Sequence, residues 1–113
     1  MPASSRLRAV EALAPVFAAL GDPTRLKLVA LLCAGGTLSI AQLTAKTEVT
    51  RQAVTKHLQV LADAGVARDL KIGRERFWQL EPTKIDAARQ SLDVIGQQWE
   101  AALGRLKAHV ESA

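Results

Sequence analysis

Amide, hydroxyl and basic side chains recur along the segment that follows Thr50. Val54, Leu58 and Leu61 are spaced four and three residues apart, which indicates a helix with one apolar face turned to a core. The polar side chains on the opposite face are Arg51, Gln52, Thr55, Lys56 and Gln59. Because such groups read base edges in the major groove, this face predicts contact with DNA.

Each polar side chain on this face has an expected contact. Gln52 is expected to bind an adenine edge through both amide atoms, and Arg51 or Lys56 to reach guanine or phosphate. Thr55 is expected to contact a thymine methyl or a phosphate, whereas Gln59 should lie nearer the DNA backbone than the bases. The predicted DNA-binding residues of this helix are therefore Thr50, Arg51, Gln52, Thr55, Lys56 and Gln59.

A second group of basic residues surrounds Gly73. Two short segments of strand character flank the turn that contains this glycine, which predicts a β-hairpin over about 66–80 with a charged tip. The side chains of this wing are expected to neutralise phosphates or to enter a minor groove, and their spacing leaves both contacts open. The predicted DNA-binding residues of the wing are Lys71, Arg74 and Arg76.

Two short helices are predicted to hold the first group in place. Ser39 can cap a helix over about 40–46, and a second helix is predicted over about 51–64. Two short helices joined by a tight turn form a helix-turn-helix, and the hairpin that follows makes the predicted fold a winged helix-turn-helix, mainly α with a small β-hairpin. We expect residues 1–113 to form a single domain, with the DNA-reading unit at about 39–80.

A longer helix precedes this unit. Asp22 followed by Pro23 is a strong helix start, because the carboxylate can accept from free backbone N–H groups and proline loses no hydrogen bond at the first position. The predicted helix runs over about 22–34 and ends at Gly35. Its inward residues are expected to be Leu26, Val29, Ala30 and Leu32 or Cys33.

Apolar side chains at helical spacing continue at both ends of the chain. One helix is predicted over about 6–20, where Pro15 should kink or restart it. Another is predicted over about 83–110, with an apolar stripe longer than a small domain needs to cover its own core. We therefore predict that these two helices form a dimer interface. Its expected residues are Leu7, Val10, Leu13, Phe17, Leu92, Ile95, Trp99, Leu103 and Leu106.

The composition agrees with a polyanionic partner. The chain has 113 residues, with 15 Lys and Arg against 11 Asp and Glu, and a formal charge of +4. Residues 50–80 carry six basic against three acidic side chains, so the positive charge lies in the middle of the chain. One cysteine, no secretory signal and no apolar stretch of membrane-spanning length favour a cytoplasmic protein without a membrane partner.

Four stretches, residues 19–26, 50–58, 61–66 and 73–76, together resemble the ArsR/SmtB family of bacterial regulators. The resemblance covers about residues 6–110. It implies a winged helix-turn-helix homodimer that pairs through its first and last helices, binds a palindromic operator in double-stranded DNA and usually represses transcription. It also implies that the second helix of the helix-turn-helix reads the major groove and that the hairpin contacts DNA at its tip.

Metal-binding members of this family have ligands that the chain lacks. The metalloid sensors carry a Cys-x-Cys pair at the start of the helix where this chain has Ser39, Ile40 and Ala41. The zinc-type site on the last helix needs an Asp-x-His pair and a second histidine with an acidic or histidine partner three residues later. In this chain the residue three positions after His109 is Ser112. We therefore expect no metal and no other cofactor.

Cys33 and His57 invite functional interpretations that the sequence does not favour. Cys33 lacks a second cysteine to form a redox pair, so it is expected to be a small apolar residue packed in its helix. His57 lies beside Leu58, and we expect it to pack locally or to donate to a phosphate rather than to bind metal.

Other functions compete with regulation by DNA binding. An enzyme is disfavoured because the chain has two His, one Cys, no Tyr and no glycine-rich phosphate loop. A winged-helix protein-interaction module would not require a basic, amide-bearing face over residues 51–59. A MarR-like or other winged-helix regulator that responds to an organic ligand keeps the function, and a small-molecule effector stays open because nothing in the sequence names a ligand.

Overall fold

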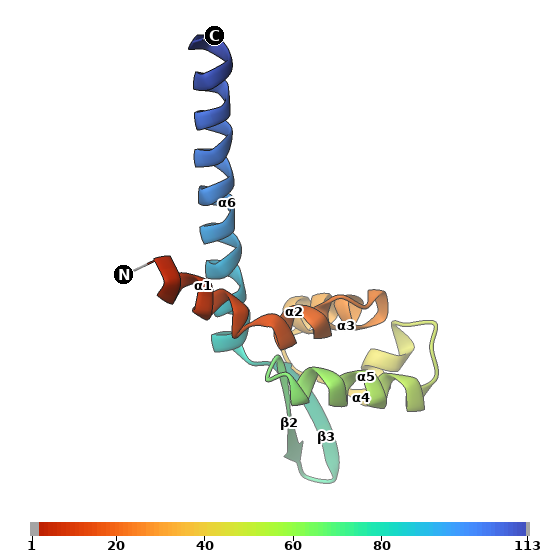
Figure 1. Cartoon of the computed structure of the whole chain (residues 1–113). Helices are drawn as coiled ribbons and strands as arrows, with labels where there is room; N and C mark the ends of the chain where they lie inside the picture. The colour runs from red at the N-terminus through yellow and green to blue at the C-terminus, as the bar shows by residue number, and fades with distance from the viewer. Residues whose placement is uncertain (1–2, 113) are drawn as a thin grey trace.

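The computed structural model describes residues 3–112, which form helices, a small sheet and short connections (Figure 1). The helix α6 rises away from the other elements, and α1 crosses it near its N-terminal part. The wing lies at the opposite end of the molecule, whose longest extent is 67 Å. The elements are α1 (Ala3–Glu11), α2 (Ala14–Leu20), α3 (Pro23–Gly35), β1 (Leu38–Ser39), α4 (Ile40–Ala45), α5 (Arg51–Asp63), β2 (Ala67–Ile72), β3 (Glu75–Leu80) and α6 (Pro82–Ser112).

Side-chain caps start the three central helices, as the sequence predicts. The Asp22 carboxylate accepts from the backbone N–H of Arg25 at 3.0 Å at the start of α3. Ser39 and Gln42 form a reciprocal capping box on α4, and the Thr50 hydroxyl accepts from the backbone N–H of Ala53 at 3.1 Å on α5. Each cap satisfies a backbone donor that has no partner inside its helix.

The core lies between α2, α3, α4, α5 and the sheet. Because α5 contributes its apolar face to this core, packing on several elements at once decides which face of the helix is turned to solvent. The β3 strand lies between the other two strands, in the antiparallel order β1-β3-β2. The buried side chains that fill the core include Leu28, Leu32, Leu43, Val54, Leu58, Leu61, Val66 and Trp78.

The wing is a hairpin with a two-residue turn. Ile72 pairs with Glu75 across the ladder, which leaves Gly73 and Arg74 as the loop. The φ of 63° at Gly73 is the left-handed conformation required at the first loop position of a type II′ turn, and glycine adopts it without a steric cost. The hairpin expected over 66–80 is therefore present.

The prediction of a single helix over residues 6–20 is wrong. The chain forms α1 and α2, with a break at Ala12 and Leu13, and α1 starts earlier than expected. Pro15 lies in the first turn of α2, where its missing N–H costs no helical hydrogen bond. The expectation that this proline restarts the helix is confirmed.

The inward face predicted for α3 is right for Leu32 and, in part, for Val29, and wrong for Leu26 and Ala30. Leu28 and Leu32 are the buried residues of α3, whereas Leu26 is 54% exposed and the Cys33 side chain is exposed. Apolar residues occupy nearly every position of this helix, so their spacing could not select the buried face. Cys33 is therefore not a packed core residue.

Candidate nucleic-acid interface

Four predicted side chains of α5 lie together on its solvent face. Val54 and Leu58 are fully buried on the other side of the helix, so the orientation of α5 forces its polar residues outward. The exposed side chains surround a shallow groove of about 580 Å³. We call them the polar face of α5: Arg51, Gln52, Thr55 and Lys56.

The cations of this face are Arg51 and Lys56. Within residues 3–112, neither Arg51 nor Lys56 lies within ion-pair distance of a carboxylate. The Thr55 hydroxyl donates to the backbone carbonyl of Arg51 at 2.9 Å, which holds this side chain against the helix. The face therefore presents positive charge and an amide that are free to meet a partner.

The other two predicted residues of this helix are exposed but do not line the groove. The Thr50 hydroxyl already accepts from the backbone N–H of Ala53 as the helix cap. The Gln59 amide donates to Asp63 at 2.9 Å, one turn further along α5. Asp63 places a negative charge beside Gln59, which makes this end of α5 less suited to a polyanion.

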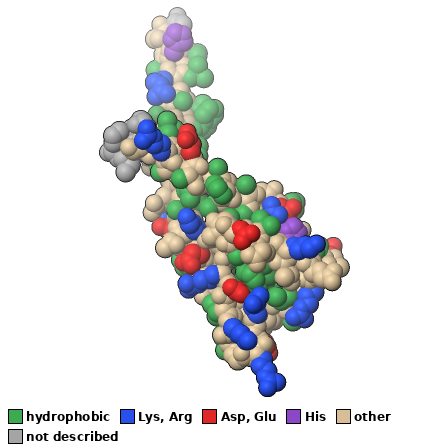
Figure 2. Space-filling model, turned by 60° about the horizontal axis from the view of Figure 1, so that its bottom comes forward, with side chains coloured by type: hydrophobic (Ala, Val, Ile, Leu, Met, Phe, Trp, Pro, Cys, Tyr) green, Lys and Arg blue, Asp and Glu red, His purple; other side chains and the backbone are tan. Residues whose placement is uncertain are grey.

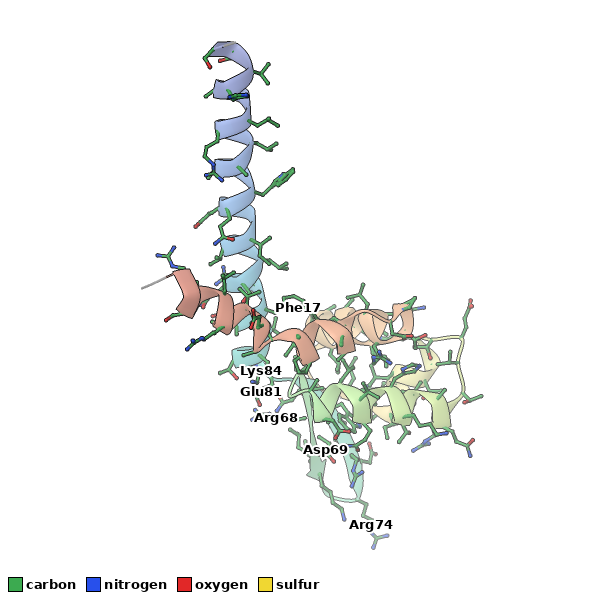
Figure 3. The ribbon with its side chains drawn as sticks, viewed as in Figure 1. Phe17, Arg68, Asp69, Arg74, Glu81 and Lys84 are labelled. Atoms are coloured by element: carbon green, nitrogen blue, oxygen red, sulfur yellow. The ribbon has the colours of Figure 1, made fainter. Side chains whose placement is uncertain are left out.

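The wing carries the second group of predicted residues. Arg74 projects from the tip, at the end of the molecule farthest from the free end of α6 (Figure 3). Lys71 is opposite Arg76 in the ladder, so both lie on the same face of the hairpin. Arg76 makes an ion pair with Asp69 at 3.1 Å, whereas Lys71 and Arg74 have no such partner within the described part of the chain.

Positive side chains gather at the wing end of the molecule. Figure 2 shows several Lys and Arg side chains around the hairpin, seen with this end turned toward the viewer. At the base of the hairpin, Arg68 forms an ion pair with Glu81 at 3.5 Å. The basic tip and the polar face of α5 thus belong to neighbouring elements, since β2 packs against α5.

Arg25, which no pattern in the sequence singles out, lies beside His57 of α5. The Arg25 guanidinium nitrogen Nη1 is 3.3 Å from His57 Nδ1, and the Asp22 carboxylate is 3.8 Å from the same nitrogen. The backbone N–H of Arg25 is the main cause that lowers the pKa of Asp22, and the charges of Arg25 and His57 act in the same direction against partial burial. His57 thus contacts side chains of its own chain, in line with the first of the two expectations for it.

The predicted dimer residues divide between exposed and buried positions. On α1, Leu7 is 52% exposed and Val10 is half-buried, while Phe17 of α2 packs partly against the core. Leu13 is 8% exposed and lies in the core of its own chain, which corrects its place among the interface residues. The α6 stripe is exposed along its length and consists of Leu92, Ile95, Trp99, Leu103, Leu106 and Val110.

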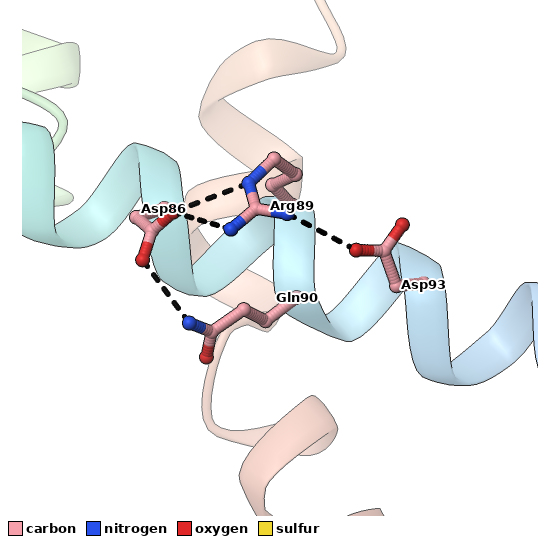
Figure 4. A network of polar contacts seen from close by, with 4 residues as sticks. All are labelled: Asp86, Arg89, Gln90 and Asp93. Atoms are coloured by element: carbon pink, nitrogen blue, oxygen red, sulfur yellow. Dashed lines mark hydrogen bonds and ion pairs between the residues drawn. The ribbon is translucent and has the colours of Figure 1, made fainter.

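A polar network lies on a different side of α6 from this stripe. Arg89 donates to Asp86 at 2.8 and 3.2 Å and to Asp93 at 3.2 Å, and Gln90 donates to Asp86 at 3.1 Å (Figure 4). The Asp86 carboxylate raises the pKa of the Arg89 guanidinium. Exposed pairs at this spacing support a helix only weakly, so the network chiefly marks the solvated face of α6.

Two hollows lie away from the polar face of α5. One of about 480 Å³ is bordered by α1 and α6, and one of about 720 Å³ is bordered by the ends of α3 and β3 and the start of α6. Cys33 borders the larger hollow. In residues 3–112, no three His, Cys, Asp or Glu side chains come together as a metal site would require, and no helix could span a membrane.

Comparisons with known proteins agree with this geometry. Residues 20–69 match a family model described as a helix-turn-helix domain. The chain is 40% identical over 85 residues to the HTH-type transcriptional regulator Rv2034 of Mycobacterium tuberculosis. The matched segment covers 75% of this chain and 76% of that protein. The chain is 30% identical over 87 residues to the arsenic resistance transcriptional regulator ArsR1 of Pseudomonas putida. The matched segment covers 74% of this chain and 68% of that protein.

A solved structure extends the likeness beyond the helix-turn-helix. An ArsR-like transcriptional regulator from Rhodococcus sp. RHA1 superposes with a TM-score of 0.74 at 33% identity, over 87% of this chain and 92% of that one. The fold and the exposed polar helix define the class of winged helix-turn-helix transcriptional regulators, which bind DNA. Within this class the chain belongs to the ArsR family, which removes the support for a MarR-like regulator or an interaction module.

Proposed function

We propose that the protein is a homodimeric repressor that binds a palindromic operator, with α5 in the major groove and the wing on the DNA backbone. The observation that carries this proposal is the polar face of α5, whose cations pair with no carboxylate within residues 3–112 and whose helix is anchored by a buried apolar face. Gln52 and Arg51 would contact base edges, while Thr50, Thr55, Lys56 and Gln59 would supply further base or phosphate contacts.

The second copy in this proposal covers the α6 stripe. A stripe of large apolar side chains along one helix exceeds what a monomeric protein usually exposes in one patch. A winged helix-turn-helix domain of Mycobacterium bovis, 20% identical with a TM-score of 0.63, is described as homodimeric, and we extend that arrangement to this chain. Two copies would place two α5 helices in successive major grooves and repress transcription by blocking polymerase.

The whole chain acts as one domain in this proposal, and no effector is needed for operator binding. Residues 39–80 form the reading unit, and α1 and α6 form the dimer layer. A small molecule that regulates DNA binding would bind in one of the two hollows beside α6, where it could change the distance between the reading units.

Replacing Gln52 with alanine is expected to weaken binding to the preferred duplex by about 1–3 kcal/mol and to relax the base preference at one position. The loss of base preference should be confined to that position, because the Gln52 amide recognises adenine through both the donor and the acceptor of that one base. Fluorescence anisotropy on a duplex enriched from a random-sequence pool, and on its single-base variants, measures this effect. Gln97→Ala on exposed α6 is the matched control, and an equal loss in both variants would contradict the proposal.

Replacing Arg74 with alanine is expected to weaken binding to all duplexes similarly and to lower the slope of log affinity against log salt by about one unit. The reason is that Arg74, which has no carboxylate within ion-pair distance among the described residues, would neutralise one phosphate. Titrations at several salt concentrations measure the slope, with Arg105→Ala on α6 as a control of equal charge change. A changed base preference with an unchanged slope would place Arg74 at base edges instead.

A further inference from the structure

Arg25 joins three helices through one side chain. Its Nε donates to the backbone carbonyl of Ala19 at 2.6 Å, and Nη2 donates to that of Ala18 at 3.4 Å. Both carbonyls belong to the last turn of α2, where a helix lacks internal donors and where its dipole favours a cation. The remaining terminal nitrogen, Nη1, lies 3.3 Å from Nδ1 of His57 on α5.

The position of Arg25 is set by α2 and α3 rather than by α5. Its backbone N–H is held by the Asp22 carboxylate at 3.0 Å, and two of its guanidinium nitrogens are held by α2. The planar fork of the guanidinium fixes the direction of the third nitrogen once the other two are bound. Arg25 is therefore held in place by α2 and α3, and its contact with His57 restrains the position of α5 relative to these two helices.

This contact requires a neutral imidazole. Arginine is always a donor, so His57 Nδ1 must offer its lone pair and carry its proton on Nε2. A protonated imidazole has an N–H at both positions, which removes the acceptor and places two cations 3.3 Å apart. The side chain of His57 is 25% exposed, so solvent screens only part of this repulsion.

The ionisable groups around the imidazole are few. The α3 side contributes Arg25 and Asp22, whose carboxylate is 3.8 Å from Nδ1, whereas α2 and α4 carry no ionisable side chain. The strand β2 also packs on α5, but its Arg68 and Asp69 pair with Glu81 and Arg76, and its Lys71 makes no hydrogen bond to His57. Asp22 would attract a protonated His57, because a carboxylate can accept a further hydrogen bond beside the one from the backbone N–H of Arg25. Protonation would therefore draw the imidazole from the guanidinium toward the start of α3.

We propose that Arg25 and His57 are positioning residues, and that the hydrogen bond from the guanidinium to neutral His57 holds the reading helix α5 in the orientation that DNA recognition requires. This inference rests on the proposed function, because it assumes that α5 reads DNA. Since Arg25 is bound to α2, which leads to the helix α1 that packs on α6, the contact also connects the reading helix with the proposed dimer layer.

The test measures the ratio of affinities for a selected duplex and for its scrambled sequence at about pH 8 and about pH 5.5, between which histidine changes charge. The duplex is the one that the wild-type protein enriches from a random-sequence pool. His57→Asn keeps an acceptor oxygen near the position of Nδ1 and cannot gain a proton in this range. His109→Gln, at the exposed far end of α6, is the matched control.

We expect the ratio for the wild-type protein and for His109→Gln to fall about tenfold as the pH is lowered, and that of His57→Asn to stay near its value at the higher pH. Using a ratio cancels the general gain in DNA affinity that any protonation brings. An equal fall in His57→Asn and the wild type would overturn the proposal. Equal binding to both duplexes at the higher pH would instead reject the reading role of α5, and this inference with it.

A second variant tests the arginine. Arg25→Lys keeps the charge but loses the planar fork, so it cannot serve α2 and His57 together. We expect it to lower the affinity ratio at the higher pH about tenfold, with thermal unfolding followed by circular dichroism to confirm that it folds. A folded Arg25→Lys protein with the wild-type ratio would contradict the proposal.

Discussion

Replacing Trp99 with glutamate is expected to convert the proposed dimer into a monomer and to lower its affinity for a palindromic duplex by about 100-fold or more. Trp99 is 63% exposed and lies between Ile95 and Leu103 along the α6 stripe. Tryptophan at the centre of an interface commonly contributes a large part of the binding energy, and a carboxylate buried there would lack a partner. The affinity falls because a monomer binds only one half-site at a time.

Sedimentation gives the mass, and anisotropy on full and half-site duplexes gives the affinity of this variant. Ala101→Glu is the matched control, because it adds the same charge to an exposed position on the other side of the same helical turn. We expect Ala101→Glu to remain dimeric with nearly unchanged affinity. A dimeric Trp99→Glu protein would move the interface away from the α6 stripe.

Replacing Leu58 with alanine is expected to lower the free energy of unfolding by about 2–5 kcal/mol. Leu58 has no exposed surface and lies on the face of α5 that fills the core with Val54 and Leu61. The loss combines the transfer of the removed methyl groups with the cavity that they leave. Urea unfolding at a fixed protein concentration measures it, since the stability of a dimer depends on concentration.

The comparison for this prediction lies on the same helix. Val60 is 41% exposed, and Val60→Ala is expected to change the free energy of unfolding by only about 0.5 kcal/mol. Both variants remove side-chain carbons from α5, and burial dominates the difference between them, because the one extra carbon and the change in helix propensity contribute less. A similar small loss for Leu58→Ala would mean that the inner face of α5 is not tightly packed.

The features that depend on neighbouring residues could be predicted from the sequence. The caps at Asp22, Ser39 and Thr50 involve partners three residues away, and each was confirmed. The outward direction of Arg51 and Lys56 follows from the spacing of the apolar residues of α5. Whether these side chains bind DNA stays a prediction, because exposure alone does not identify a partner.

The features that depend on distant parts of the chain could not be predicted in the same way. The buried face of α3 is chosen by its partners, since Leu26 and Leu28 are equally apolar but only Leu28 is buried. The strand β1 has two residues and exists through its pairing with Trp78 and Phe77 of β3. The contact between Arg25 and His57 joins residues 32 positions apart, and no local pattern encodes it.

The exposure of Cys33 has a practical consequence. It is the single cysteine of the chain, and its thiol lies near the end of α3 at the border of the larger hollow, which includes no residue of the polar face of α5 or of the α6 stripe. A thiol-reactive fluorophore would therefore attach at one known place on each copy without any engineered residue. Energy transfer between donor and acceptor dyes on two paired copies would then follow, in real time, how far apart the reading units stand as DNA is bound and released.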